Sequence, residues 1–296
     1  MDYELSLNRK TKFSEQMKVL FLTKFSEVEN FLLNFTQKIH KALPLEVDVL
    51  HVVNSYPQVP LKLDGTIIDK CVDYDLSGLE KLQKEEQILA EEIKSVHPFI
   101  SSASVKIGDL RRIVKYLLIQ KDYDFIFMGS HKTSLIEDWT NETTIDRILE
   151  QVDIPVLSLK CDQSHNAGVE RIGIFHDFSS SKQPKKIESL SKLAKALSSE
   201  AHLFKFVKEP LSEEKQAEWE KRMRAFATEN ELNNYQLHIL PMKGANEEEL
   251  MTQQIAEEGL QLIAIPELHR KSVNWMFGKN LKSSIADHVL APLLIY

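Results

Sequence analysis

The stretch that decides the fold is Asp124–Lys160, which begins with DFIFMGSH at residues 124–131. Its first apolar run ends at Gly129, a polar segment and a helix-period patch at 145–149 follow, and the apolar run IPVLSL closes the unit at 154–159. Short apolar runs favour buried strands, and a patch with helical period between two of them favours a crossover helix. The stretch therefore predicts a parallel α/β unit with a ligand crevice at the carboxyl ends of its strands.

The same alternation of strands and helices precedes this unit. Apolar, β-branched runs at 18–23, 47–53 and 104–107 predict three more strands of the parallel type. Ser26 and Glu29 have the spacing of a capping box at a helix start. The order of elements predicts a doubly wound parallel sheet. The expected helix faces are Val28, Phe31, Leu32, Phe35 and Ile39; Leu79, Leu82, Leu89 and Ile93; and, after Gly108-Asp109, Leu110, Ile113, Val114, Leu117 and Leu118.

After a polar linker the pattern starts again. The spacing between matching positions falls from 153 residues at Ser26/Ser179 to 137 at Pro155/Pro292, and the difference lies in a loop at 54–75 that the second half lacks. We therefore predict two copies of one domain, residues 1–162 and residues 168–296. The expected second-half elements are strands at 171–175, 202–207, 260–265 and 291–295, and helices marked by Ile187, Leu190, Leu193, Ala194 and Leu197, by Trp219, Met223 and Phe226, and by Leu250, Met251 and Ile255; Gly244 is matched with Gly108.

Composition limits the class of protein. Apolar residues make up 43% of the 296 residues and the formal charge is −7, which favours a soluble globular protein and argues against a nucleic-acid surface. No apolar run approaches the roughly 20 residues that span a bilayer, so we expect no membrane association. The polar N-terminus lacks a signal core, and Cys71 and Cys161 read as two free thiols, so we expect a cytoplasmic protein without disulfides.

Several short motifs lie at the expected strand ends and helix starts: Asp177-Phe-Ser, Val207 after the second strand of its half, Gly108-Asp109, Asp124-Phe-Ile-Phe-Met-Gly-Ser-His131, Thr143, and Ile154-Pro155-Val-Leu. Together they resemble the motifs of the universal stress protein family, and the resemblance covers residues 18–296. It implies two tandem Rossmann-like doubly wound domains, each a five-stranded parallel sheet with helices on both faces. It also implies that the two domains pair through their final strands as an internal pseudo-dimer.

Many members of the family bind ATP through an Asp at the end of the first strand and a loop of the pattern Gly-x-x-Gly, nine residues, Gly and Ser or Thr. Glycines let backbone N–H groups approach phosphates, and the following helix N-terminus favours negative charge. In the first half Gly129 keeps the first glycine and Thr143 keeps the hydroxyl, while His131 lies beside them. Lys24 stands at the Asp position, and Glu142 places negative charge where a triphosphate would lie.

The second half departs from the pattern differently. Asp177 is kept, but Pro266 replaces the first glycine and removes a backbone donor. A turn of Gly278, Lys279 and Asn280 offers a small anion-binding site. The resemblance adds Val207 to the residues expected at a ligand in this half.

The sequence thus favours a non-enzymatic stress-response binding or regulatory protein with degenerate ATP-binding loops and no tightly held cofactor. The alternative is a nucleotide-binding switch, with ATP or AMP in the second domain and slow ATPase activity. An apolar ligand between helices is a third reading, and assembly of several copies is left open. No catalytic set is recognisable, and the ten histidines show no paired spacing with Cys, Asp or Glu that predicts zinc.

Overall fold

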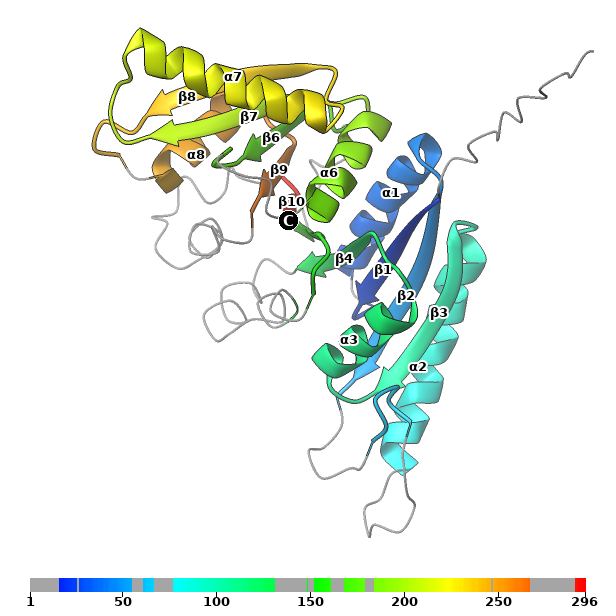
Figure 1. Ribbon diagram of the computed structural model, residues 1–296. Coiled ribbons are helices and arrows are strands. Elements are labelled where there is room, and N and C mark those ends of the chain that lie inside the picture. The colour runs from blue at the N-terminus through cyan, green and yellow to red at the C-terminus, as the bar shows by residue number, and fades with distance from the viewer. Residues whose placement is uncertain are drawn as a thin grey trace, which may run out of the picture.

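The computed structural model describes residues 16–25, 27–54, 61–66, 77–130, 148, 152–160, 168–178, 184–245, 247–266 and 291–296. The described strands form one ten-stranded sheet with helices on both faces (Figure 1). The α/β class and the mostly parallel sheet are as predicted. Across the sheet the strands run β3 (Ile100–Ile107), β2 (Leu45–Val53), β1 (Met17–Thr23), β4 (Phe125–Ser130), β5 (Val156–Lys160), β10 (Leu293–Ile295), β9 (Leu262–Ile265), β6 (Arg171–Phe175), β7 (Glu200–Val207) and β8 (Tyr235–Pro241).

The two halves of the sheet meet at β5 and β10. These strands pair antiparallel, with Leu294 opposite Leu157, whereas the other neighbouring pairs of described strands are parallel. Residues 293–296 are at most 1% exposed. The last strand of the chain is therefore a buried central strand that makes the two half-sheets continuous.

The sheet separates the core into two apolar layers, and each layer is covered by the helices on that face. One apolar cluster includes residues of α1 (Glu27–Ala42), α2 (Ser77–Val96), α6 (Pro184–Ala196) and α7 (Glu213–Glu229). The other includes residues of α3 (Leu110–Gln120) and α8 (Glu247–Glu257). On the first of these faces α1 contacts α6, so helices as well as strands join the two halves (Figure 1).

Matching hydrogen bonds in the two halves link the first residues of a strand to the residues just before or at the start of its neighbour. At the opposite, carboxyl ends of β1 and β6, Phe25 and Phe178 occupy matching positions and share a left-handed backbone, with φ of 56° and 51°. Such a conformation is uncommon for a bulky residue, so its recurrence is informative. The bonds are Lys18 N–H to Asp124 Oδ2 (2.8 Å) and Ile126 N–H to Pro155 O (3.0 Å) in the first half, and Arg171 N–H to Gln261 Oε1 (3.1 Å) and Ile263 N–H to Pro292 O (2.9 Å) in the second.

Most predicted helix faces are buried as expected, including Leu32, Ile113, Met223 and Ile255. The face predicted for α2 is only partly correct, since Leu82 and Leu89 are 40% and 43% exposed. This helix lies over the edge strand β3 and its neighbour β2, so the sheet covers only one side of it.

Two predictions in the second half are wrong or incomplete. The match of Gly244 with Gly108 is displaced by two residues. Gly108 N–H donates to Val53 O (2.9 Å), and in the second half it is Met242 N–H that donates to Val207 O (2.8 Å). The sequence pattern also predicted no strand where β8 lies. That edge strand is mostly half-buried, and Gln236 and His238 interrupt its apolar residues, so it lacks the continuous apolar run of the others.

Only parts of the predicted loop at 54–75 are described. Its turn at residues 61–66 lies against the end of β3, because a Cβ on Gly65 would be 2.6 Å from Ile107 O. Cys71 and Cys161 lie outside the described residues. Within the described chain, none of the helices combines the length and the apolar character that crossing a bilayer requires.

Candidate functional site

A pocket of about 190 Å³ opens at the carboxyl ends of the strands in the first half. It lies beside β1 and β4, the place where the strand order reverses and where parallel α/β sheets commonly bind ligands. Four segments converge there because parallel strands end at the same edge. The lining residues are Leu22, Thr23, Lys24 and Glu29; Leu50, His51, Val52 and Asn54; Asp109, Leu110 and Arg111; and Met128 and Gly129.

The polar side chains of this first pocket are held by local bonds. Glu29 is buried, and its Oε1 accepts from Lys24 N–H (3.0 Å). Ser26, the other member of the predicted capping box, lies outside the described residues. His51 Nδ1 lies 2.7 Å from Thr23 O, and its Nε2 lies 2.6 Å from Glu86 Oε2. Both ring nitrogens of His51 thus face oxygen atoms, which fixes the orientation of the imidazole.

The start of α3 forms the opposite wall of the first pocket. Asp109 caps the helix by accepting from Arg112 N–H (3.1 Å), as the predicted helix start requires. Arg111 lies 3.5 Å from the same carboxylate. The pocket therefore carries both signs of charge at its rim.

The matching pocket of the second half is much smaller, about 40 Å³. The registers of β1 with β2 and of β6 with β7 place Phe175, Phe204 and Phe206 at the positions of Leu22, Leu50 and Val52. Phe175 stacks on Phe204 with 4.7 Å between ring centroids and on Phe206 with 5.8 Å. Three phenylalanine rings occupy the space that stays open in the first half.

Charged groups remain at the rim of this second pocket. Asp177 lines it with a side chain that is 49% exposed, and Lys205 lies across from it. Burial lowers the pKa of Lys205, and the carboxylate of Asp177 partly offsets that effect. The Lys205 ammonium also lies 4.5 Å from the centre of the Trp219 ring.

The residues predicted at a ligand thus divide into three groups. Gly129 lines the first pocket and Asp177 lines the second, although the two do not share one pocket. Val207 ends β7 and is not a lining residue of the second pocket; its carbonyl accepts from Met242 N–H. The remaining five lie outside the described residues: His131, Thr143, Gly278, Lys279 and Asn280.

The two pockets differ in their fit to a nucleotide. Since a water needs about 10–15 Å³ on this measure, the described second pocket has room for about three waters and not for a nucleobase. The first pocket holds on the order of fifteen waters, enough for a small molecule. It offers Lys24 where the family's ATP-binding members carry a carboxylate.

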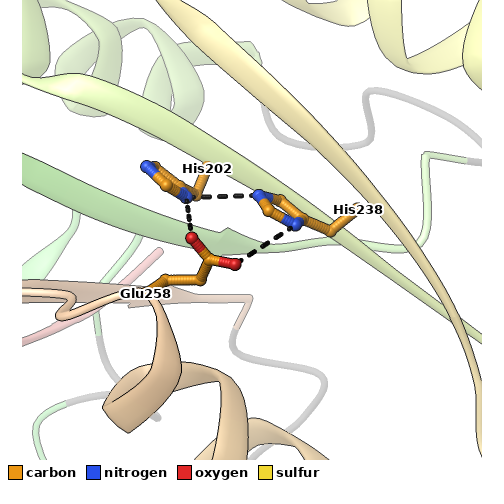
Figure 2. A group of neighbouring side chains, drawn as sticks. All are labelled: His202, His238 and Glu258. Atoms are coloured by element: carbon orange, nitrogen blue, oxygen red, sulfur yellow. Dashed lines mark hydrogen bonds and ion pairs between the residues drawn. The ribbon is translucent and has the colours of Figure 1, made fainter.

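A separate cluster of His202, His238 and Glu258 lies in the second half (Figure 2). His202 Nδ1 is 3.2 Å from His238 Nε2 and 3.5 Å from Glu258 Oε2. His202 is 1% exposed, and Glu200 Oε2 lies 3.3 Å from its Nε2. Burial lowers the pKa of His238, which favours the neutral imidazole.

Sequence reasoning did not single out this cluster because its members are far apart in the chain. They come from β7, from β8 and from the segment after α8. The register places His202 opposite Gln236, so His238 lies two residues further on the same face of the sheet. A histidine on each of two adjacent strands is the signal that could have indicated it, once β8 was recognised as a strand.

Comparison with known proteins gives one family match and several similar folds. Residues 16–160 match the model of the universal stress protein family. A universal stress protein from Archaeoglobus fulgidus DSM 4304 is 19% identical, with a TM-score of 0.63 over 94% of this chain and 95% of that chain. A putative universal stress protein from Pseudomonas aeruginosa UCBPP-PA14 is 15% identical, with a TM-score of 0.58 over 95% and 93%. Among curated proteins, no match was found.

The structural likenesses show the fold over nearly the whole chain, and the family model identifies its first part. Five strands, the pocket at the reversal of strand order and Gly129 all lie within the matched segment or its sheet. Residues 16–160 are a universal stress protein domain.

Proposed function

We propose that the protein is a tandem universal stress protein that acts as a non-enzymatic, stress-responsive binding module. In this proposal residues 168–296 are a second domain of the same kind, and the two pair through their final strands as an internal pseudo-dimer. The matching hydrogen bonds and the left-handed Phe25 and Phe178 support the second domain. The symmetric pairing of Leu157 with Leu294, which are matching positions 137 residues apart, supports the pseudo-dimer.

The observation that carries the binding role is the open pocket at the switch point of the first half. Its volume of about 190 Å³ contrasts with about 40 Å³ in the second half. The three phenylalanines account for that contrast, because each is larger than the aliphatic residue at the matching position. We therefore assign small-ligand binding to the first domain.

The contacts of His51 support a role in binding rather than catalysis. A general base needs a free nitrogen lone pair directed at the proton that it removes. Nδ1 of His51 instead pairs with Thr23 O, and its Nε2 lies 2.6 Å from Glu86 Oε2. This histidine is accordingly assigned to shaping the pocket.

A nucleotide switch in the second domain is the competing function. Asp177 and Lys205 at the rim of the second pocket favour it, since both could contact a ribose or a phosphate. The phenylalanine rings would have to move to admit a base. The two functions therefore predict opposite sites for any nucleotide.

Thermal-shift measurements with millimolar AMP, ADP and ATP separate the two functions, with phosphate release assayed in parallel. Ligand stabilisation follows RT ln(1 + [L]/Kd), so binding shows as a rise in Tm. Leu50→Phe fills the first pocket with the ring found at the matching second-half position, and Asp177→Asn removes the second carboxylate. We expect no phosphate release, and we expect any nucleotide shift to be lost in Leu50→Phe and kept in Asp177→Asn.

The opposite pattern would support the switch. A shift that survives Leu50→Phe and disappears in Asp177→Asn would move the ligand to the second domain. Release of phosphate that Asp177→Asn abolishes would overturn the non-enzymatic assignment. Phe206→Val, which introduces the first-half residue into the second pocket, is the matched control for ring-size changes.

A further inference from the structure

The two halves differ at one corner of the fold, where the first residues of β2 or β7 lie beside the residue that follows α3 or α8. In the first half this corner holds a cation: Lys121 Nζ lies 2.6 Å from Glu46 Oε1 and 2.5 Å from Asp48 Oδ2. Lys121 directly follows α3, and the two carboxylates come from β2. The ammonium balances negative charge that the sheet would otherwise hold without a partner.

The matching corner of the second half has the same carboxylate on the sheet and no lysine. The register of β6 with β7 puts His202 at the position of Asp48 and Glu200 at that of Glu46. Glu258 takes the position of Lys121. Lys121 lies three residues before Asp124, and Glu258 lies three residues before Gln261, and these two side chains accept the matching hydrogen bonds from Lys18 N–H and Arg171 N–H. Where the first half has the cationic Lys121, the second half therefore has side chains that can donate electron pairs.

The donor atoms have the separations of a metal site. With Zn–N distances of about 2.0–2.1 Å, tetrahedral donors lie about 3.3 Å apart. The distances from His202 Nδ1 to His238 Nε2 and to Glu258 Oε2 are 3.2 and 3.5 Å, and the three residues can each offer one donor atom within 4.8 Å of the others (Figure 2). Small rotations of His238 and Glu258, which are 15% and 30% exposed, would direct their lone pairs at one point.

The cluster has more lone pairs than protons to satisfy them, which favours a bound cation. If His202 Nε2–H donates to Glu200, its Nδ1 carries a lone pair that faces His238 and the carboxylate of Glu258. A proton from His238 Nε2 satisfies that lone pair but leaves His238 Nδ1 without one, 3.9 Å from Glu258 Oε1. A bound metal ion would accept all three lone pairs at once.

The surroundings of His202 are those of a metal-bound histidine. Its second nitrogen faces Glu200, and Glu200 Oε1 in turn accepts from Gln236 Nε2–H (3.0 Å). Carboxylates in this position fix the orientation of ligand histidines and raise their basicity. Glu258 in the cluster and Glu200 beside it together carry two negative charges, which match the charge of a divalent ion.

We propose that His202 Nδ1, His238 Nε2 and Glu258 Oε2 bind a divalent transition-metal ion, with Zn²⁺ as the closest chemical match and Glu200 orienting His202. Imidazole nitrogens with one carboxylate suit zinc, whereas magnesium prefers an all-oxygen octahedron. Three protein ligands leave a fourth position for water. The ion would take the place that the Lys121 ammonium fills in the first half.

The test is a metal titration of the full chain after treatment with a chelator. Isothermal titration and thermal shift with ZnCl₂ are expected to show one binding event and a higher Tm, and MgCl₂ is expected to produce neither. Co²⁺ should give the visible absorption of a tetrahedral site. Glu200→Gln, which alters only the orienting carboxylate, should weaken zinc binding by about 10- to 100-fold.

Two variants separate loss of the site from loss of the fold. Glu258→Lys introduces the first-half residue beside Glu200 and should abolish zinc binding without lowering the Tm of the metal-free protein. His238→Gln should also abolish binding, whereas His97→Gln, a histidine of the first half, should bind as the unaltered protein does. A zinc shift that persists in Glu258→Lys, or the absence of any zinc shift in the unaltered protein, would overturn the proposal and leave a hydrogen-bonded histidine pair.

Discussion

Asp48 shows how a single side chain can tie together three elements. Its carboxylate, on β2, accepts from Lys121 after α3, from Tyr123 before β4 and from Ser102 on β3. Burial alone would raise the pKa of Asp48, but these hydrogen bonds and the charge of Lys121 outweigh it and lower the pKa below the ordinary 3.8. Burial and the bond to Asp48 also raise the pKa of Tyr123.

The lowered pKa of Asp48 makes a prediction about acid stability. A carboxyl whose pKa is lower in the folded state stabilises the fold above its unfolded pKa, and that stability is lost as the pH falls through the folded pKa. Asp48→Asn should therefore cost about 1–3 kcal/mol of unfolding free energy near neutral pH, as for hydrogen bonds to charged groups. The difference from the unaltered protein should shrink below about pH 4, where the unfolded Asp is protonated.

Urea denaturation from pH 3 to pH 7 measures this difference. Tyr123→Phe, which removes one neutral donor and keeps the Lys121 pair, is the comparison and should cost about 1 kcal/mol. A difference between Asp48→Asn and the unaltered protein that stays constant across this range would contradict the assigned pKa direction.

At this same scale the sequence located some site residues and missed others. Gly129 and Asp177 line their pockets. Their positions could be predicted because a local apolar run indicates where a strand ends. The filling of the second pocket by Phe204 and Phe206 could not be predicted, because it depends on which residues face each other across β6 and β7. The same reason hid the pair His202 and His238.

At the scale of elements, the pairing of β5 with β10 is the feature that joins the halves. Val156, Leu157 and Leu159 are fully buried, and Ser158 is 4% exposed. Without β10, β5 would be an unpaired apolar edge strand, and such an edge favours association with another strand. The sequence predicted most strands because central parallel strands are continuous apolar runs, but it missed β8 because an edge strand needs no such run.

Residues 16–160 produced alone should therefore dimerise through β5. Light scattering after size exclusion should give the mass of a dimer. In the full chain Leu157 faces Leu294 at the centre of the symmetric pairing, so in this dimer Leu157 should face its own copy. Leu157→Cys should then form a disulfide-linked dimer on oxidation, because opposite strand residues lie within disulfide range.

The unaltered half, which retains Cys71 and Cys161, is the control for background oxidation, and the full chain with Leu157→Cys should not cross-link, since β10 covers that position. A monomeric first half at all concentrations would contradict the proposed pseudo-dimer interface.

At the scale of the whole molecule, one sheet carries two sites that differ between its halves. The first half keeps an open switch-point pocket and closes its opposite corner with Lys121. The second half fills the pocket with phenylalanine and places two histidines and Glu258 at the corner. The repeat in the sequence predicted the doubling of elements, whereas this exchange of open and closed sites depends on side-chain packing.

A crystal structure of the protein, purified without added nucleotide and also soaked in millimolar ATP, tests the central claim most directly, because both pockets can be inspected at once. The account predicts a small molecule in the first pocket, against His51 and Lys24, with Phe175, Phe204 and Phe206 still stacked in the second. A nucleotide seated beside Asp177 with those rings displaced, and nothing bound in the first pocket, would contradict it.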